Sequence, residues 1–157
     1  MLSDDQVAYL VGHRVARLAT VDKSGQPHAV PVCFAVVDGL IYTPLDRKPK
    51  RVAGERLRRV RDLAANPAVC LVVDTYDEDW TRLRWLQVRG TGSLVWINNE
   101  QRRAVEALEA RYPQYSSMRL EELPVIRITP TDVVEWSWSD RTVYADGREP
   151  LHDDQGP

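Results

Sequence analysis

The first residues of the chain have the polar and apolar spacing of a short helix. Ser3 and Gln6 are three positions apart, the spacing of a capping box in which each side chain bonds a backbone N–H of the other residue. Val7 and Leu10 then follow on one helical face. We predict a helix over residues 4–12.

After this helix the apolar residues recur at the short period of strands. Residues 14–21, 30–37 and 40–43 are rich in β-branched side chains, which favour strands. Residues 22–25 and the Asp38-Gly39 dipeptide separate these runs and are typical of tight turns. The pattern predicts three antiparallel strands that form a meander.

The rest of the chain combines two helical patterns with more strands. Helices are expected over residues 52–65 and 100–112, and strands over residues 68–74, over 82–97 with a bulge or bend at Gly90 or Gly92, and in two pieces of 125–138 that Pro130 separates. Six or seven strands without strand–helix alternation favour a mainly β fold, an antiparallel barrel with flanking helices.

The composition of the chain indicates how many domains it forms and in which compartment it is expected. The 157 residues are 43% hydrophobic and 28% charged, as in an ordinary globular domain, which we assign to residues 1–139. The polar residues 140–157 lack an apolar pattern and are expected to form a flexible tail. Two cysteines outside any CxxC pair, an acidic N-terminus and the lack of a long apolar run favour a cytoplasmic protein with no membrane span.

The sequence contains few side chains that are expected to catalyse a reaction without a cofactor. Ser24 is expected to serve a turn, Cys33 and Cys70 to fill the core, and residues 77–79 to form a solvated acidic loop. The three histidines lie far apart, and no nucleophile or nucleotide-binding motif is present. We therefore assign no catalytic residue and no metal site, and we expect a cofactor to supply any chemistry.

Positive charge is concentrated in one segment of an otherwise acidic chain. Residues 46–61 carry eight basic and two acidic side chains, whereas the rest carries 13 basic and 21 acidic ones. Lys48 and Lys50 flank a proline, and two such point charges suit a phosphate group. The arginines of the following helix either contribute to this anion site or form a solvated face. Nucleic-acid binding through residues 47–61 is disfavoured because the rest of the chain is acidic.

Tryptophan is the second unusual feature of the sequence. Five tryptophans occur, of which Trp80 and Trp85 lie near the start of the long predicted strand. A flat heteroaromatic ligand would pack against such rings, and core or dimer packing is the alternative. Trp96 is expected to serve core or dimer packing, and Trp136 and Trp138 are expected on one side of a strand.

Four blocks of the chain together resemble the pyridoxamine 5′-phosphate oxidase-like split-barrel flavoproteins, most closely the branch that uses the deazaflavin coenzyme F420. The blocks are ATVDKSGQPHAVPV (19–32), DGLIYTPLDRKPKR (38–51), LRRVRDLAANPAVCLVVD (57–74) and DEDWTRLRWLQVRGTGSLV (77–95). The resemblance implies a homodimer of six-stranded antiparallel split β-barrels, with two cofactor sites at the subunit interface.

The resemblance also implies which residues bind the cofactor. The flavin-type ring is expected against Val30, Pro31, Val32 and Cys33, its phosphate at Tyr42, Thr43, Lys48, Lys50 and Arg51, further ring contacts at Trp80, Arg84 and Trp85, and the longer anionic tail of F420 at Arg56 and Arg58.

Two departures from the family pattern bear on function. The basic residues at 47–50 are displaced from the usual Arg-Lys pair, and the C-terminal Arg-x-His motif of the true oxidases is missing, which disfavours vitamin B6 oxidation. The resemblance implies an F420-dependent oxidoreductase that transfers a hydride to an electron-poor small molecule, with a proton from solvent or from Tyr42. The alternatives are an FMN-dependent oxidoreductase and a non-catalytic protein that binds a cofactor, haem or another tetrapyrrole.

Overall fold

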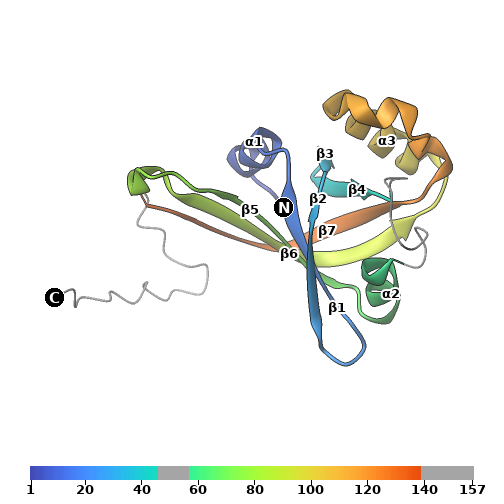
Figure 1. Cartoon of the computed structure of the whole chain (residues 1–157), viewed down its shortest axis with the longest axis horizontal. Helices are drawn as coiled ribbons and strands as arrows, with labels where there is room; N and C mark the ends of the chain where they lie inside the picture. The colour runs from blue at the N-terminus through green and yellow to red at the C-terminus, as the bar shows by residue number, and fades with distance from the viewer. Residues whose placement is uncertain (46–56, 139–157) are drawn as a thin grey trace.

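One curled antiparallel sheet organises the part of the chain that the computed structural model describes, residues 1–45 and 57–138 (Figure 1). Its seven strands lie in the order β2-β1-β5-β6-β7-β4-β3. In chain order the elements are α1 (Asp4–Gly12), β1 (Ala16–Val21), β2 (Pro27–Val32), β3 (Ala35–Val37), β4 (Leu40–Pro44), α2 (Arg58–Ala65), β5 (Ala68–Thr75), η2 (Trp80–Arg82), β6 (Arg84–Val95), α3 (Asn99–Arg111), η3 (Pro113–Ser117), η4 (Leu120–Glu122) and β7 (Val125–Ser137).

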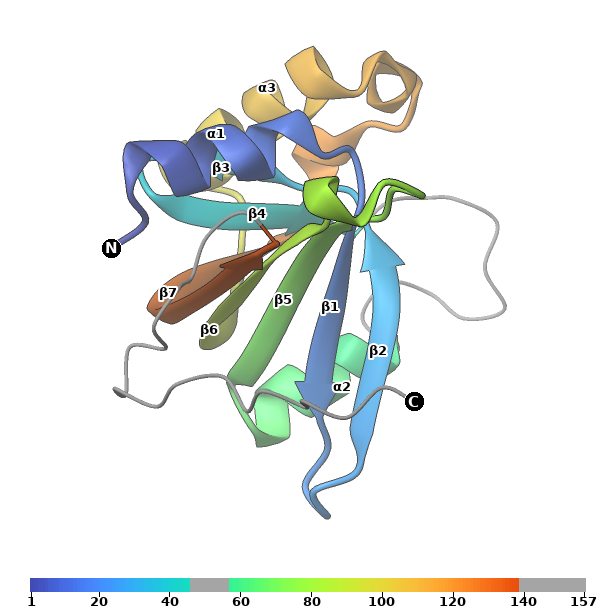
Figure 2. The same ribbon diagram turned by 90° about the vertical axis from the view of Figure 1, so that its left-hand side faces the viewer.

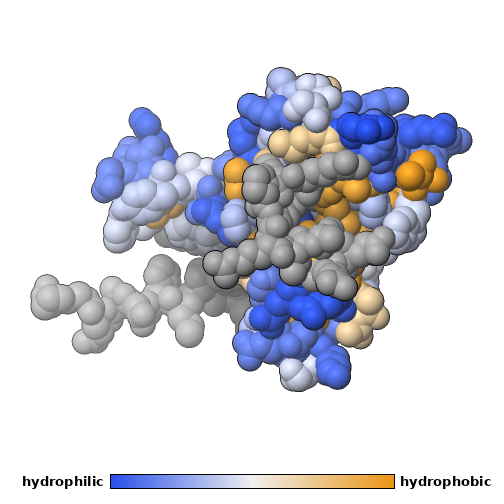
Figure 3. All heavy atoms as spheres, turned by 45° about the vertical axis from the view of Figure 1, so that its right-hand side comes forward, coloured by the Kyte–Doolittle hydropathy of each residue, from blue (hydrophilic) through white to orange (hydrophobic). Residues whose placement is uncertain are grey.

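The sheet curls because its two edge strands are neighbours in the sequence. β2 and β3 lie at opposite ends of the strand order, yet only Cys33 and Phe34 separate them. The sheet therefore bends round into a half-barrel, with α2 at one end and α1 and α3 at the other (Figure 2). In the space-filling view, hydrophilic residues cover both ends and hydrophobic residues reach the surface between them (Figure 3).

One tyrosine hydroxyl holds the crossing between the two edge strands. The hydroxyl of Tyr112, which directly follows α3, accepts the backbone N–H of Phe34 at 3.2 Å. Its single proton is shared between two acceptors, the carbonyl oxygens of Arg14 at 2.8 Å and of Phe34 at 2.9 Å. Because Phe34 is fully buried, its backbone groups need partners within the protein. The hydroxyl thus supplies hydrogen bonds to the backbone of Phe34, where pairing with a neighbouring strand stops.

Two hydrophobic clusters fill the two sides of the sheet. The larger lies inside the half-barrel, where strand residues such as Leu71 meet Leu10 of α1 and Leu63 of α2. The smaller lies under α3, where Leu108 packs with Tyr42 of β4 and the start of β7. The face of β1, β5 and β6 that points away from the larger cluster carries no helix of the described chain (Figure 2).

A buried carboxylate fixes α2 to the first two strands. Asp62 is only 4% exposed and accepts the hydroxyl proton of Thr20 at 2.7 Å. His28 Nδ1 lies 3.7 Å and Arg58 Nε 3.9 Å from its Oδ2 atom. Arg58 also approaches Asp22 in the β1–β2 turn, at 3.6 Å. These contacts set α2 against β1 and β2.

The predicted helix cap and tight turn are confirmed, whereas the six strands implied by the family resemblance are too few. The capping box of Ser3 and Gln6 is present, and Asp38 and Gly39 form the expected turn with φ angles of 52° and 76°. The sheet has seven strands and not six, because residues 30–37 break into β2 and β3. The predicted meander was wrong, since β2 and β3 do not pair.

Two further expectations from the sequence were wrong. β7 runs uninterrupted through Pro130. The register between β6 and β7 shifts by one residue at Arg89 and Gly90, so that Thr131 has no paired residue on β6, and this bulge accommodates the proline. Of the core or dimer packing expected for Trp96, core packing is wrong, because Trp96 follows β6 and is 54% exposed; dimer packing stays a prediction. None of the described helices has the length and hydrophobicity needed to cross a membrane.

We expect Tyr112→Phe to lower the free energy of unfolding by about 1–3 kcal/mol, because it leaves buried backbone groups of Phe34 without a partner. Urea denaturation measures the loss. Tyr76→Phe is the matched control, since Tyr76 is 68% exposed and its variant should unfold like the wild type. Equal stability of the two variants would contradict the role given to this hydroxyl.

We expect Gly90→Ala to destabilise the protein by about 1–3 kcal/mol, because a Cβ atom there would lie 2.2 Å from the carbonyl oxygen of Thr129. Gly12→Ala is the control, since a Cβ at that position has no atom within 4 Å apart from its chain neighbours and the backbone of its own helix. Thermal melting of both variants checks the difference. A Gly90→Ala protein as stable as Gly12→Ala would contradict this prediction, because the backbone at the register shift would then move at little cost in free energy.

Candidate functional site

The candidate site lies on the outer face of the sheet, the face turned away from the larger cluster. Side chains alternate along each strand, so the residues between core positions point outward. One register row of this face runs across four strands through Ala19, Cys70, Arg89 and Asp132. The next row on the same face pairs Val72 with Gln87.

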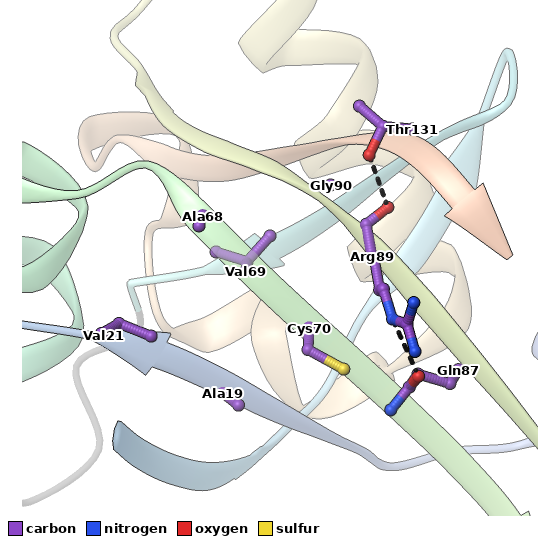
Figure 4. Close-up of a pocket in the computed structure, with 9 residues that line it drawn as sticks. All are labelled: Ala19, Val21, Ala68, Val69, Cys70, Gln87, Arg89, Gly90 and Thr131. Atoms are coloured by element: carbon purple, nitrogen blue, oxygen red, sulfur yellow. Dashed lines mark hydrogen bonds between the residues drawn. The ribbon is translucent and has the colours of Figure 1, made fainter. Parts of the chain in front are cut away.

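An open groove of about 460 Å³ is hollowed in this face (Figure 4). Its lining residues are Ala19, Val21, Ala68, Val69, Cys70, Gln87, Arg89, Gly90 and Thr131. Small and apolar side chains from β1 and β5 form one half of the groove, and polar side chains from β6 and β7 form the other. The groove therefore offers a flat apolar surface next to a row of hydrogen-bonding groups.

Hydrogen bonds fix the polar half of the groove. Arg89 Nε donates to Gln87 Oε1 at 3.1 Å, and Arg89 Nη1 donates to Asp132 Oδ2 at 3.3 Å. The Thr131 hydroxyl donates to the carbonyl oxygen of Arg89 at 3.4 Å. Figure 4 shows the sulfur of Cys70 directed toward the Gln87 side chain. The register shift at Gly90 lies within this network, as bulges often do where a strand shapes a site.

The thiol of Cys70 is half-buried in the groove and not part of the core as expected. Burial raises the pKa of this thiol, and the positive charge of Arg89 and the hydrogen bond with Gln87 offset only part of that effect. Cys70 is therefore a protonated thiol at neutral pH. Since the thiolate is the nucleophilic form, Cys70 is poorly reactive.

The outer-face arginines each have an acidic partner. Arg17 bonds Asp74 across β1 and β5, and Arg89 pairs with Asp132 across β6 and β7 at 3.3 Å. Both pairs are exposed, so each contributes little to stability. These two ion pairs do affect binding, because they leave the outer face of the described sheet without an arginine that lacks an acidic partner.

The expected ring-lining residues of β2 point in alternating directions. Val30 and Val32 pack into the larger cluster, whereas Pro31 is exposed on the outer face. Cys33 lies just beyond the strand and packs against the smaller cluster. A ring placed on the outer face would therefore meet the side chain of Pro31 and only the backbone of its neighbours.

Tyr42 and Thr43 are likewise directed to opposite sides of β4. Tyr42 belongs to the cluster under α3, and its hydroxyl donates to Glu100 Oε1 at 2.9 Å. Burial, with the Glu100 carboxylate adding to it, raises the pKa of Tyr42 to about 12. Thr43 is 1% exposed on the other side, level with Ile41 of the larger cluster. Tyr42 therefore keeps its proton, held on a carboxylate beneath a helix.

Arg84 and Trp85 are adjacent in β6 and so face opposite ways. Arg84 points toward α1, where its guanidinium lies 4.2 Å from the centre of the Tyr9 ring and 3.1 Å from Glu135. Trp85 is half-buried on the outer face, in register with Trp136. The structure thus brings Trp85 to the groove face and takes the Arg84 side chain away from it.

The remaining predicted residues lie at the margins of the described structure. Trp80 begins η2 at the end of the β5–β6 hairpin, 57% exposed and with its ring centre 6.3 Å from that of Trp138. Arg58 is half-exposed at the start of α2. Lys48, Lys50, Arg51 and Arg56 lie outside the described residues.

Sequence reasoning missed the residues that line the groove. Gln87, Arg89 and Thr131 come together only through the pairing of β6 with β7, which the sequence does not specify. One signal was present: Gly90 within a strand pattern indicated a bulge, and the register shift lies there. Following the alternate residues of β6 around that glycine would have found Gln87 and Arg89.

Comparison with known proteins places this fold in a family. The model of the pyridoxamine 5′-phosphate oxidase family matches residues 2–137. A 5a,11a-dehydrotetracycline/5a,11a-dehydrooxytetracycline reductase of Streptomyces rimosus is 29% identical over 135 residues, which cover 83% of this chain and 80% of the reductase.

Solved structures show the same fold at lower sequence identity. A conserved hypothetical protein of Mycobacterium tuberculosis has a TM-score of 0.70 at 21% identity, with 88% of this chain and 86% of that chain covered. An FAD-binding protein of Mesorhizobium loti has a TM-score of 0.64 at 21% identity, covering 85% and 92%. The haem storage protein HutZ of Vibrio cholerae has a TM-score of 0.66 at 16% identity, covering 87% and 95%. With nearly the whole described chain matched by the family model, this chain belongs to the pyridoxamine 5′-phosphate oxidase family.

Proposed function

We propose that the protein is an oxidoreductase that transfers a hydride between the deazaflavin coenzyme F420 and an electron-poor small molecule. The observation that carries the reductase part of this proposal is the 29% identity with a dehydrotetracycline reductase over most of both chains. The choice of F420 rests on the resemblance of the sequence blocks to the branch that uses this coenzyme. A fold of this kind leaves the redox chemistry to a bound coenzyme.

The described residues fit the ring of such a coenzyme better than its phosphate. Trp85 of β6 and Pro31 of β2 present apolar surfaces on the outer face, and the strands between them bear Val72 and the paired side chains of Arg17 and Asp74 there. The arginines of that face, Arg17 and Arg89, are both paired with aspartates. We therefore propose that the basic residues between 47 and 58 bind the phosphate: Lys48, Lys50 and Arg51, with Arg56 and Arg58 nearer the anionic tail.

When bound, the coenzyme supplies or accepts the hydride, and the protein orients it and keeps water from the ring. The protein offers few proton donors for this reaction. Tyr42 is buried and its hydroxyl is bonded to Glu100. We therefore propose that the proton needed by the reduced product comes from solvent.

FMN is the alternative coenzyme, since it is also a phosphorylated three-ring molecule that the same residues would accept. The two are distinguished by colour: protein that carries FMN is yellow after dialysis, whereas a colourless protein that binds F420 on titration supports the deazaflavin. Binding of haem and of neither flavin would favour a storage protein. We also propose a homodimer with the coenzyme at the subunit interface, which the mass in solution tests.

We expect Lys50→Ala to weaken coenzyme binding by about 1.5–3 kcal/mol, because a charge-assisted contact with phosphate is lost. Equilibrium titration with F420 measures the change. Lys23→Ala is the control, since Lys23 is an exposed lysine in the β1–β2 turn and its loss should leave the affinity unchanged. An equal affinity of both variants would remove Lys50 from the phosphate site.

We expect the coenzyme to quench the fluorescence of Trp85, because the ring binds on the outer face beside this side chain. Trp85→Phe should therefore remove most of the quenching seen when F420 is added to the wild type. Trp96→Phe serves as the comparison, since Trp96 is exposed beyond the end of β6. Quenching that persists in Trp85→Phe and vanishes in Trp96→Phe would move the ring away from the outer face.

A further inference from the structure

Polar side chains join α1 to the inner side of the sheet, at the end of the larger cluster. Thr75 and Arg84 each lie two positions from a core residue of β5 or β6, so both point inward. Their partners come from one face of α1 and from the residue that ends this helix. These contacts form what we call the α1 clamp, which consists of Gln6, Tyr9, His13, Thr75, Arg84 and Glu135.

The Tyr9 hydroxyl is the centre of the α1 clamp. It donates to the backbone carbonyl oxygen of Arg84 at 2.9 Å and lies 3.0 Å from the Thr75 hydroxyl. His13 supports this arrangement, since its Nδ1 donates to the carbonyl oxygen of Tyr9 at 2.8 Å and its Nε2 lies 3.0 Å from Thr75 Oγ1. Thr75 and Arg84 are the last register pair before the tip of the β5–β6 hairpin. One hydroxyl of α1 therefore contacts both strands of this hairpin.

The Arg84 side chain extends the α1 clamp to β7. Its guanidinium lies 4.2 Å from the centre of the Tyr9 ring, and its Nη2 donates to Oε2 of Glu135 at 3.1 Å. Nε2 of Gln6 donates to the other oxygen of the same carboxylate, Oε1, at 3.4 Å. The Arg84 and Glu135 side chains are 35% and 34% exposed, so water only partly screens these contacts. All three strands, β5, β6 and β7, are thus fixed to α1.

The same strand segments carry an aromatic pair on the outer face. Trp85 follows Arg84 in β6. Trp136 follows Glu135 in β7, and the two indoles are half-buried and in register. Because neighbours along a strand point to opposite sides, the α1 clamp lies directly behind this pair. A change that lets Arg84 and Glu135 move therefore moves the backbone from which both indoles project.

The core gives this part of the sheet little support. In Figure 1 the tip of the β5–β6 hairpin projects beyond α1 and away from the rest of the sheet. Two side chains near this tip, Tyr76 and Trp80, are 68% and 57% exposed. Segments with few buried apolar contacts open locally at low cost in free energy. The contacts with α1 therefore matter more here than they would beside the larger cluster.

We propose that α1 positions the aromatic pair of the outer face, and that Tyr9 is a positioning residue that acts through Arg84 to hold Trp85 where it meets the coenzyme ring. For the contact between Trp85 and the ring, this inference rests on the proposed function. The α1 clamp lies on the other side of the sheet, so none of its side chains has to touch the coenzyme. Contacts on the inner side thus set the geometry of the outer side.

The test incorporates a fluorinated tryptophan into the full-length protein and records fluorine NMR spectra without coenzyme. Trp85→Phe assigns the Trp85 resonance, which disappears in that variant. Tyr9→Phe removes the central hydroxyl of the α1 clamp, and Thr75→Val removes its neighbour with little change of volume. Both should shift or broaden the Trp85 resonance. Thr75→Ser keeps a hydroxyl and should leave this resonance at its wild-type position.

Two controls separate positioning from a loss of stability. Tyr112→Phe is expected to destabilise the protein but lies outside the α1 clamp, so the Trp85 resonance should stay in place. Tyr76→Phe changes an exposed tyrosine next to Thr75 and should also leave it in place. A Trp85 resonance that does not move in Tyr9→Phe overturns the inference, and so does an equal shift in Tyr112→Phe.

Titration with F420 connects this positioning with binding. Tyr9→Phe should weaken F420 binding about threefold or more, as expected for a coupling carried through packed side chains, whereas Tyr112→Phe should bind like the wild type. If the wild type binds F420 and Tyr9→Phe binds it equally well, the inference is overturned. A wild type that binds neither F420 nor FMN refutes the proposed function, and the fluorine spectra alone then decide whether α1 positions Trp85.

Discussion

The hydroxyl of Tyr112 is the contact on which the rest of this architecture depends. At Phe34 the chain leaves one edge of the sheet and starts the other, and a buried backbone without strand partners is costly there. The Tyr112 hydroxyl accepts the N–H of Phe34 and shares its proton between the carbonyl oxygens of Phe34 and Arg14, which fixes the end of α3 beside the segment that leads into β1. The split in the barrel, the curl of the sheet and the position of α3 thus share one origin.

The curl decides which side chains are able to form a site. One side of each central strand is committed to the core, so the opposite side is the surface on which a ligand can lie. Neighbours in sequence are separated by this rule: Trp85 lies on the outer face, while Arg84 turns inward to Tyr9 and Glu135. A segment that resembles a cofactor site therefore contributes side chains at alternate positions and backbone at the others.

The sequence predicted features that depend on a few adjacent residues, such as the capping box at Ser3 and the turn at Asp38 and Gly39. It did not reveal the break at Phe34, because the only proline of the apolar run 30–37, Pro31, lies within β2 and not at the crossing, which also has no glycine. The partner that permits the break is 78 positions away, in Tyr112. The groove was missed for the same reason, since the pairing of β6 with β7 creates it. The expected phosphate site at Lys48 and Lys50 lies outside the described residues and stays a prediction.

The distribution of charge connects the fold with the two parts of the proposed coenzyme site. Exposed ion pairs such as Arg89 with Asp132 add little stability, so their physical effect is to cancel charge beside the groove. The excess of basic over acidic residues lies elsewhere in the sequence, within residues 46–61. A phosphorylated ligand gains from uncompensated cations, whereas an uncharged ring gains from apolar contact and hydrogen-bond donors already held in place. In the proposed function, the anion is therefore bound by this segment and the flat apolar ring by the outer face.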